Sequence, residues 1–171
     1  MAPRFEELID QHHDEIFGYL WRLLGKDGRW DAAMDVEDLA QEVFLRAYRA
    51  FGNLRPNSNH RAWLYKIATN CAYSRIKQIK NQRDHASSLK DAETDAGAAS
   101  EISTFHKDTE QRLHALVNRL PAKQKACVTL RYLQDLDYPE IAQILGCSQN
   151  SVRANVYQAI RRLRVEMEEQ K

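Results

Sequence analysis

The chain has 171 residues, 43% of them hydrophobic, and a formal net charge of +1 at pH 7. This composition fits one or two folded domains and argues against a chain that is disordered throughout. No stretch is long and apolar enough for a membrane-spanning helix or a secretory signal, so we expect a cytoplasmic protein without membrane insertion.

Charge is unevenly distributed along this nearly neutral chain. Residues 1–42 carry 11 acidic and 4 basic side chains, whereas residues 43–83 carry 9 basic ones and residues 148–164 carry 4, both without an acid. Two acid-free segments indicate a polyanion that is contacted at two places, because phosphates attract Lys and Arg whatever the base sequence. For either segment taken alone, a solvated helix face is the alternative.

The first two predicted elements are helices. Apolar residues keep helical spacing from Phe5 to Leu24, and Gly25 is a plausible stop. A second helix is predicted with Asp35 as its cap and Gly52 as its end. Its apolar stripe is the clearest in the chain and comprises Val36, Leu39, Ala40, Val43, Phe44, Ala47, Tyr48 and Phe51.

An Asn-rich loop at residues 53–61 separates the second helix from a third, which is predicted to begin at about Ala62. The residues expected to face inward on the third helix are Trp63, Leu64, Ile67, Ala68, Cys71 and Ile79. Trp63 could instead be a stacking platform for a base. The other side of this helix is predicted to be basic, with Lys66, Arg75, Lys77, Lys80 and Arg83.

An acidic, Ser- and Ala-rich segment at residues 84–108 is predicted to be a flexible linker. It would join two small helical domains, residues 1–83 and residues 109–171, in an all-α fold. The second domain begins with a short apolar-striped helix that ends before Pro121. Another helix follows, with Cys127, Leu130 and Leu133 on related faces.

The last two predicted helices have the spacing of a helix-turn-helix. Asp137 can cap the first of them together with Glu140, with Pro139 in the first turn. Gly146 permits a tight turn with positive φ, and Ser148 can cap the second. An ordinary helical hairpin is the alternative, but the acid-free final helix favours contact with DNA.

That final helix could enter a major groove and present polar side chains to base edges. The candidate base-reading residues near its N-terminus are Gln149, Asn150, Arg153, Asn155 and Tyr157. Arg161, Arg162 and Arg164 lie further along the helix, where we expect contacts with phosphates.

Two longer blocks resemble a known family. The blocks "DVEDLAQEVFLRAYRAF" and "HRAWLYKIATNCAYSRIK" look like region 2 of the sigma-70 family. The block "LPAKQKACVTLRYLQDLDYPEIAQILGCSQNSVRANVYQAIRRLR" resembles its region 4. Because nothing resembles region 3, the likeness points to the extracytoplasmic-function (ECF) group of RNA polymerase sigma factors.

The resemblance implies partners and site residues. Core RNA polymerase would be contacted at its beta-prime clamp and its beta flap. The clamp contact is implied for Asp38, Gln41, Glu42, Leu45 and Arg46. An anti-sigma factor is a further expected partner, and exposed remnants of the apolar stripes between the domains would suit it.

The resemblance also implies where promoter DNA binds. Strand opening and recognition of the minus 10 element are implied for Asn57, Ser58, Asn59, His60, Arg61, Lys66, Asn70, Ser74, Lys77 and Lys80. Amide and hydroxyl groups suit the edge of a flipped base, and basic side chains suit the backbone. The minus 35 contacts are implied for Arg153, Asn155, Tyr157 and Gln158, with fewer Arg, Lys and Ser side chains than the family commonly has.

One further departure from the family is the long connection at residues 25–34, which contains Trp30. We interpret it as a surface insertion, with contact to a regulator as the alternative.

Nothing in the sequence indicates catalysis or a cofactor. There is no Gly-rich phosphate loop or nucleophile motif, and adjacent His12 and His13 diverge on a helix, so they do not form a metal site. Cys71, Cys127 and Cys147 lack the spacing of a zinc site or a disulfide framework, and we expect buried thiols.

Two other classes of protein remain to be distinguished from a sigma factor. A stand-alone helix-turn-helix regulator would explain residues 148–164 but would leave the basic segment 43–83 without a role. A helical adaptor that binds only proteins would explain neither basic segment. Salt-dependent DNA binding separates the adaptor from the other two, and a requirement for core polymerase separates the sigma factor from the regulator.

Overall fold

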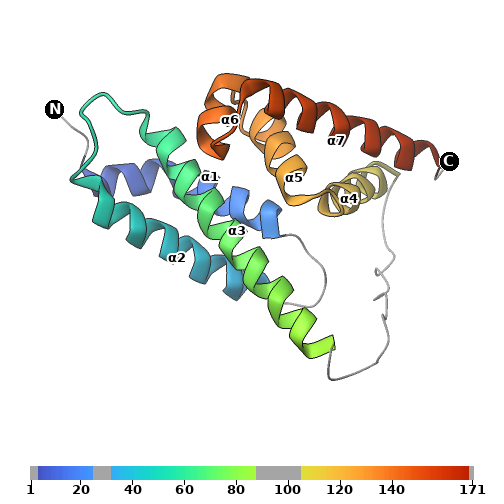
Figure 1. Ribbon diagram of the computed structural model, residues 1–171, viewed down its shortest axis with the longest axis horizontal. Helices are drawn as coiled ribbons and strands as arrows, with labels where there is room; N and C mark the ends of the chain where they lie inside the picture. The colour runs from blue at the N-terminus through green and yellow to red at the C-terminus, as the bar shows by residue number, and fades with distance from the viewer. Residues whose placement is uncertain (1–3, 25–31, 88–104, 170–171) are drawn as a thin grey trace.

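Every regular element among the described residues is helical, which confirms the predicted all-α class. The computed structural model describes residues 4–24, 32–87 and 105–169 (Figure 1). In chain order the elements are α1 (Phe5–Leu24), α2 (Ala32–Phe51), α3 (His60–Ser87), α4 (Phe105–Asn118), α5 (Ala122–Val128), the π-helical turn η1 (Thr129–Leu133), α6 (Tyr138–Leu145) and α7 (Gln149–Glu169).

Helices α1, α2 and α3 pack into one bundle through their apolar stripes. Ile16 of α1, Val43 of α2 and Leu64 of α3 are fully buried, and burial of such stripes drives helices together. The buried Tyr19 hydroxyl of α1 forms a 2.8 Å hydrogen bond with Thr69 Oγ1 of α3. The polar atoms of this core pair are therefore satisfied.

The predicted starts of two helices are shifted in the structure. Helix α2 begins at Ala32, so Asp35 lies in its first turn and is not its cap. The residues before Asp35 include Ala, the strongest helix former, which extends the helix backward. Helix α3 begins at His60, because Asn59 Oδ1 accepts a 3.0 Å hydrogen bond from the Ala62 amide and caps the helix there.

Two side chains predicted to be buried are exposed. Tyr48 is 64% exposed, and its ring lies at the rim of the bundle with its centroid 5.3 Å from that of Phe5. Leu133 is 53% exposed, although it lies three residues after the fully buried Leu130. The π-helical turn η1 explains the second error, because its wider hydrogen-bonding period shifts Leu133 away from the core.

The C-terminal helices confirm the predicted helix-turn-helix. Asp137 and Glu140 form a complete capping box at the start of α6. Gly146 ends α6 with a φ of 62°, a conformation that disfavours most side chains. Helices α6 and α7 pack against each other, and the buried side of α7 includes Val152 and Val156.

The two predicted domains share a core. Helix α6 packs along α3, and Leu130, Leu136 and Ile141 belong to the same cluster of buried residues as Tyr65 and Ala68 of α3. A smaller cluster lies between α4, α5 and α7 and contains Leu116, Leu120, Val128, Ala159 and Leu163. The sequence did not predict the contact between α3 and α6.

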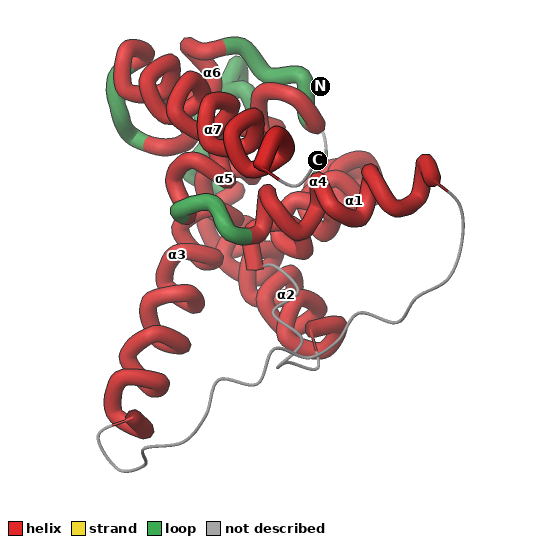
Figure 2. Tube along the Cα trace, turned by 90° about the vertical axis from the view of Figure 1, so that its right-hand side faces the viewer, coloured by secondary structure: helices red, strands yellow, loops and turns green. Residues whose placement is uncertain are grey.

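The predicted linker falls mainly outside the described residues. Residues 84–87 of that prediction belong to α3, and residues 105–108 belong to α4. The final turns of α3 extend beyond the packed helices (Figures 1 and 2), and residues 81–86 are exposed. The connection at residues 25–31, including Trp30, also lies outside the described residues.

The cysteines differ in their accessibility. Cys71 and Cys127 are buried as predicted, but Cys147 is half-buried in the turn after α6, so that part of the prediction is wrong. Burial raises the pKa of the Cys71 thiol, and burial together with nearby Cys147 raises the pKa of Cys127 to about 12. Thiolate, the reactive form, is therefore scarce at both buried positions.

We expect an alkylating reagent at pH 8 to modify Cys147 of the folded chain and to leave Cys71 and Cys127 largely unmodified. Peptide mass spectrometry after brief iodoacetamide treatment measures each site separately, and labelling in denaturant serves as the control for full reaction. Modification of Cys127 as fast as Cys147 would contradict the described core.

Candidate nucleic-acid interface

Helix α2 presents the predicted polymerase-contact residues as a mostly exposed face. Asp38, Gln41 and Arg46 are exposed, and Leu45 is 57% exposed. Glu42 is half-buried and forms an ion pair with Arg46 one turn away. The five predicted residues therefore lie on one helix but are not equally available.

A groove that the sequence did not reveal adjoins this face. It has a volume of about 830 Å³ and lies between α1 and α2. Gln41 and Leu45 line it together with residues outside the prediction, among them Ile9, His13, Phe17, Phe44 and Tyr48. The His13 and Phe44 rings stack across it with their centroids 5.7 Å apart. Only the tertiary contact between the two helices creates this surface.

Three of the predicted minus 10 residues lie in the loop before α3, and a fourth, His60, is the first residue of that helix. Asn57 and Asn59 are exposed, whereas Ser58 and His60 are half-buried. The Asn59 side chain is partly engaged, because Oδ1 caps α3 and one N–H of Nδ2 donates a 3.3 Å hydrogen bond to Glu140 Oε1 of α6. Asn57 is therefore more open to a ligand than Asn59, whose amide already makes two hydrogen bonds.

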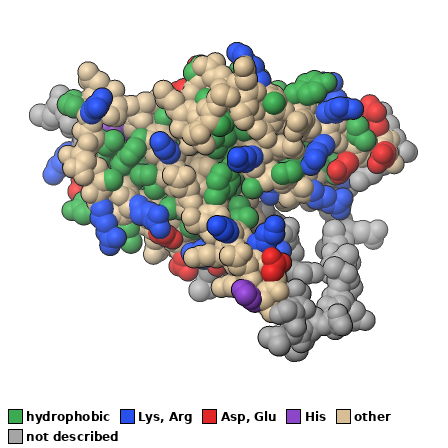
Figure 3. All heavy atoms as spheres, viewed as in Figure 1, with side chains coloured by type: hydrophobic (Ala, Val, Ile, Leu, Met, Phe, Trp, Pro, Cys, Tyr) green, Lys and Arg blue, Asp and Glu red, His purple; other side chains and the backbone are tan. Residues whose placement is uncertain are grey.

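Helix α3 places five further predicted residues in solvent. Lys66, Asn70, Ser74, Lys77 and Lys80 are all exposed. All five follow each other at spacings of three or four residues, which puts them on one side of the helix. In Figure 3, Lys and Arg side chains are spread across the face of the molecule that includes α3. This row is suited to contact a phosphate backbone.

Two arginines of the basic segment do not lie on this open row. Arg75 was predicted on the basic side of the third helix, but its guanidinium lies 3.9 Å from carboxylates of both Asp35 and Glu42 on α2. Arg61 forms a bidentate ion pair with Glu15 of α1, in which Nε lies 3.2 Å from Oε1 and Nη2 lies 2.9 Å from Oε2. Acidic residues of the N-terminal segment therefore neutralise part of the basic one.

Arg61 belongs to a polar cluster that joins the two halves of the molecule. The cluster comprises Glu15, Arg61, Tyr65 and Gln134, and we call it the interdomain cluster. Arg61 donates a 3.1 Å hydrogen bond to the carbonyl oxygen of Gln134. The Tyr65 hydroxyl lies 2.7 Å from Gln134 Oε1 and 3.2 Å from Glu15 Oε2. Residues of α1 and α3 thus hold the segment after η1.

Electrostatics within the cluster favour its charged form. Burial raises the pKa of Glu15, but the hydrogen bonds and charges of Arg61 and His12 outweigh burial, so the pKa of Glu15 lies below its ordinary value. The hydrogen bond to Glu15 is the main cause that raises the pKa of Arg61. Burial, followed by the charge of Glu15, raises the pKa of Tyr65. Glu15 and Arg61 therefore stay ionised near neutral pH.

Helix α7 offers an exposed polar face at its N-terminal half. Ser148 Oγ accepts a 3.1 Å hydrogen bond from the Ser151 amide and caps the helix. Burial of one apolar side of α7 leaves the opposite side to solvent, with Gln149, Asn150, Arg153, Tyr157 and Arg161 exposed. Tyr157 is 68% exposed. Five of the seven predicted minus 35 residues therefore share an open surface.

Neighbouring side chains restrain two predicted residues on α7. The Arg153 guanidinium lies over the Tyr138 ring, 5.3 Å from its centroid, and Arg131 contacts the same ring at 4.9 Å. The Asn155 amide nitrogen donates a 2.8 Å hydrogen bond to the carbonyl oxygen of Ser151. Arg153 is therefore oriented by a cation–π contact, whereas Asn155 has a donor already in use.

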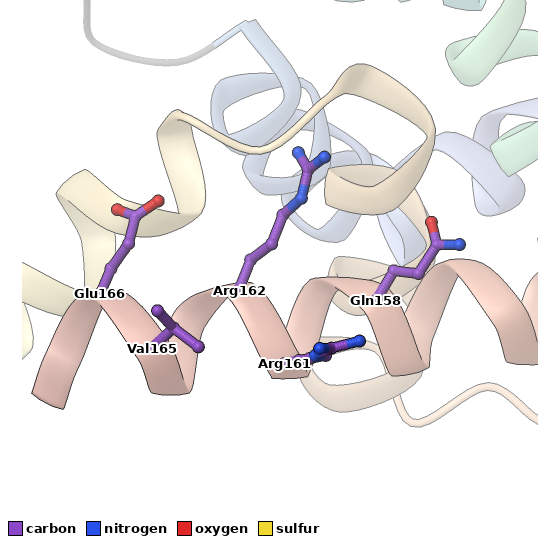
Figure 4. A pocket seen from close by; sticks show the side chains of 5 residues that line it. All are labelled: Gln158, Arg161, Arg162, Val165 and Glu166. Atoms are coloured by element: carbon purple, nitrogen blue, oxygen red, sulfur yellow. The ribbon is translucent and has the colours of Figure 1, made fainter.

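Gln158 and Arg161, two of the seven predicted residues, project from different sides of α7. Gln158 and Arg162 point toward the side where α5 lies, while Arg161 lies on another side (Figure 4). The Gln158 side chain accepts a 3.1 Å hydrogen bond from Gln124 Nε2 of α5. Arg161 is the better placed of Gln158 and Arg161 to reach a ligand along the open face.

The described residues hold neither a metal-binding cluster nor a membrane-spanning helix. Among them, no three His, Cys, Asp or Glu side chains gather in a way that could hold a metal ion. No helix in the described ranges has the length and apolar character that crossing a membrane requires.

Comparison with known proteins assigns both halves of the chain. The family model for Sigma-70 region 2 matches residues 8–82, and that for Sigma-70, region 4 matches residues 110–163. The RNA polymerase sigma-H factor of Pseudomonas aeruginosa is 29% identical over 163 residues, which are 91% of this chain and 81% of that protein. The ECF RNA polymerase sigma-E factor of Escherichia coli strain K12 is 32% identical over 153 residues, 84% of this chain and 80% of that protein.

Solved structures show the same fold. The sigma factor RpoE of Bartonella quintana, solved in complex with the anti-sigma factor NepR, aligns with a TM-score of 0.73 at 20% identity over 98% of each chain. CnrH, solved in complex with the cytosolic domain of CnrY, aligns with a TM-score of 0.67 at 18% identity, over 98% of this chain and 89% of that one.

We expect the ion pair of Glu15 to make stability depend on acid. Because the folded-state pKa of Glu15 is lowered, the stabilisation is complete above the ordinary value of 4.5 and is lost as the pH falls through the folded-state pKa. Urea unfolding between pH 6 and pH 3 should show a smaller loss of unfolding free energy for Glu15→Gln than for the wild type. Parallel losses in the two proteins would contradict this role of Glu15.

Proposed function

The chain belongs to the ECF group of the sigma-70 family, and on this basis we propose that it binds core RNA polymerase and directs it to promoters through a minus 35 and a minus 10 element. A sigma factor is a transcription initiation factor and not an enzyme. The polymerase therefore supplies the chemistry, and this chain supplies recognition. Its place of action would be the cytoplasm, where polymerase and promoters meet.

The observation that carries the proposal is the presence of two separate exposed polar surfaces on one chain. One surface is the open face of α7, which comprises Gln149, Asn150, Arg153, Tyr157 and Arg161. The other is the row along α3, which comprises Lys66, Asn70, Ser74, Lys77 and Lys80. A stand-alone regulator needs only the first surface. Two surfaces suit a protein that reads two promoter elements and opens one of them.

The minus 35 element would be read by the N-terminal half of α7 in the major groove. Arg153 is suited to a bidentate contact with guanine, and Gln149 and Asn150 are suited to adenine. Tyr157 offers an aromatic ring for contact with a thymine methyl group or the backbone. Arg161 would lie further along the helix, against phosphates.

The minus 10 element would be opened at the loop before α3 and held along that helix. Asn57 and Ser58 offer hydrogen-bonding groups for the edge of a flipped base. The exposed Lys66, Lys77 and Lys80 would hold the single-strand backbone, with Asn70 and Ser74 between them. Arg61 would join them only after leaving Glu15.

Core polymerase would bind the exposed face of α2. The combination of acidic residues with an exposed Leu45 and the adjoining groove fits a partner helix that carries basic and apolar side chains. In this proposal the clamp of the beta-prime subunit is that partner, and the beta flap contacts the C-terminal helices. An anti-sigma factor is a further proposed partner, because the RpoE protein of Bartonella quintana was solved with one.

The experiment that tests the proposal is run-off transcription with purified core polymerase, with and without this protein, on DNA from upstream of its own gene. A discrete transcript that requires both components supports a sigma factor. The opposite result has three parts: the chain binds duplex DNA unaided, does not co-elute with core polymerase and yields no transcript. In that case the stand-alone regulator becomes the better assignment.

Arg153→Ala should weaken promoter binding by roughly 1 to 3 kcal/mol if this side chain reads a base, because a bidentate base contact has about that value. Arg162→Ala is the matched control, since Arg162 projects from another side of α7 (Figure 4) and, as an expected phosphate contact, should lower binding by the same factor on every sequence. Competition binding on promoters that differ within the minus 35 element gives the measurement. An equal loss on every sequence would assign Arg153 to phosphate contact alone.

Asn57→Ala should impair strand opening and spare duplex binding by α7, because Asn57 is exposed in the loop and is remote from α7 in sequence. Asn53→Ala, at another exposed asparagine of the same loop, is the control. Permanganate reactivity of promoter thymines reports opening. Full reactivity with Asn57→Ala would remove Asn57 from the minus 10 assignment.

A further inference from the structure

The first residue of α6, Tyr138, lies outside the helix that is proposed to read the minus 35 element, yet its ring contacts a residue of that helix. We propose that Tyr138 is a positioning residue, which holds Arg153 of α7 in place for contact with one base and so contributes to promoter specificity. The inference rests on the proposed function, in which Arg153 reads a base in the major groove.

Tyr138 is itself held in place by its surroundings. It directly follows Asp137, the cap of α6, and Pro139 stiffens the same turn. Its half-buried ring packs against the main cluster of buried residues. Arg131 lies over this ring, 4.9 Å from its centroid, and donates a 3.0 Å hydrogen bond to the carbonyl oxygen of Leu136. The ring is therefore a fixed platform beside α7.

The open face of α7 borders this platform. The guanidinium carbon of Arg153 lies over the Tyr138 ring, 5.3 Å from its centroid, which is within the range of a cation–π contact. Tyr138 also lines a groove of about 600 Å³ together with Arg153, Tyr157 and Arg161 of the open face. Tyr138 therefore adjoins the surface that is proposed to read the minus 35 element.

A cation–π contact can restrain a guanidinium and leave its hydrogen-bond donors available. A guanidinium can rest on an aromatic ring while the N–H groups along its edge still bind a base. The contact of Arg61 with Glu15 is of a different kind, because it commits two donors of Arg61 to one carboxylate. Arg153 is thus oriented before DNA arrives and can still form a bidentate contact with guanine.

Restraint of Arg153 should affect discrimination between bases more than general affinity. A freely moving arginine has many rotamers and can also reach a phosphate or a neighbouring base. Because the ring limits these alternatives in the free protein, less conformational entropy is lost when the base contact forms. Contacts of other side chains with phosphates do not depend on the ring. Tyr138 should therefore favour the specific site over a nonspecific duplex.

Three variants of the full chain separate the ring from other properties of Tyr138. Tyr138→Leu removes the aromatic platform and keeps an apolar side chain against the core. Tyr138→Phe keeps the ring and removes only the hydroxyl group. Tyr132→Leu is the matched control, because Tyr132 lines the same groove and is 59% exposed, but its ring is not the one over which Arg153 lies. Urea unfolding of each variant measures any general loss of stability.

Discrimination is measured with holoenzyme, by competition between the promoter upstream of the protein's own gene and duplexes with single base-pair changes in the minus 35 element. The informative base pair is the one that the wild type distinguishes and Arg153→Ala does not. There we expect Tyr138→Leu to reduce discrimination about twofold to fivefold, the value of one exposed cation–π contact. Tyr138→Phe and Tyr132→Leu should match the wild type, and binding of a nonspecific duplex should be the same in all.

A double variant distinguishes a positioning role from a direct contact. If Tyr138 acts through Arg153, Tyr138→Leu should have no further effect on discrimination once Arg153 is replaced by Ala. A merely structural role of Tyr138 would lower affinity or stability in both backgrounds.

The restraint itself is measured in the free chain, without polymerase or promoter. NMR relaxation of the Arg153 Nε–H group reports its motion on the picosecond to nanosecond timescale. We expect its order parameter to fall in Tyr138→Leu and to persist in Tyr138→Phe and Tyr132→Leu.

Three results of the competition experiment would overturn the proposal. One is discrimination by Tyr138→Leu equal to that of the wild type. Another is an equal loss of affinity on every sequence, which would assign Tyr138 to a phosphate contact or to general stability. The third is an effect of Tyr138→Leu that persists when Arg153 is already replaced.

Failure of the proposed function gives a different pattern. If the wild type forms no holoenzyme with core polymerase, the proposed function fails, and the minus 35 role of Tyr138 fails with it. The order parameter of Arg153 still decides whether Tyr138 restrains that side chain: a fall in Tyr138→Leu alone supports the restraint, and an unchanged value overturns it.

Discussion

The helix α3 is the element on which both halves of the molecule depend, because three different surfaces share its circumference. One side packs on α1 and α2, another packs on α6, and a third carries the exposed row that begins at Lys66. A helix with two packed sides cannot show a simple apolar stripe, so its pattern in the sequence is less distinct than that of α2. Any force that moves α6 therefore acts on the helix that is proposed to hold the minus 10 strand.

Charge segregation along the sequence has a structural counterpart. The acid-rich N-terminal segment supplies Glu15, Asp35 and Glu42, which face Arg61 and Arg75 of the basic segment. The chain thus neutralises part of its own basic surface and leaves the lysines of α3 open. A polyanion could contact these lysines directly. To contact Arg61, it would have to displace the Glu15 carboxylate. Partial self-neutralisation also limits nonspecific attraction to nucleic acid.

Features that depend on local chemistry could be predicted from the sequence, and those that depend on tertiary contact could not. The capping box of Asp137 and the turn at Gly146 were predictable because their partners lie within a few residues. The exposure of Leu133 was not, because a π-helical turn has no clear sequence signal and alters the period. The pairing of Arg61 with Glu15 joins residues 46 positions apart. The sequence of the basic segment therefore does not show which of its arginines are paired with a carboxylate.

The two surfaces that are proposed to read the promoter are not equally open in the described structure, and this asymmetry would affect the order in which they bind. The open face of α7 keeps Arg153 and Tyr157 exposed while α6 rests on α3, whereas Arg61 and Asn59 are engaged. A ligand shifts a conformational equilibrium only through its difference in affinity for the two states. In the proposed function, duplex DNA at α7 would need no change in the contacts between α3 and α6. Single-stranded DNA at α3 would compete with Glu15 for Arg61 and with Glu140 for Asn59. The upstream duplex would therefore bind without displacing an internal contact, whereas the opened strand would have to displace two.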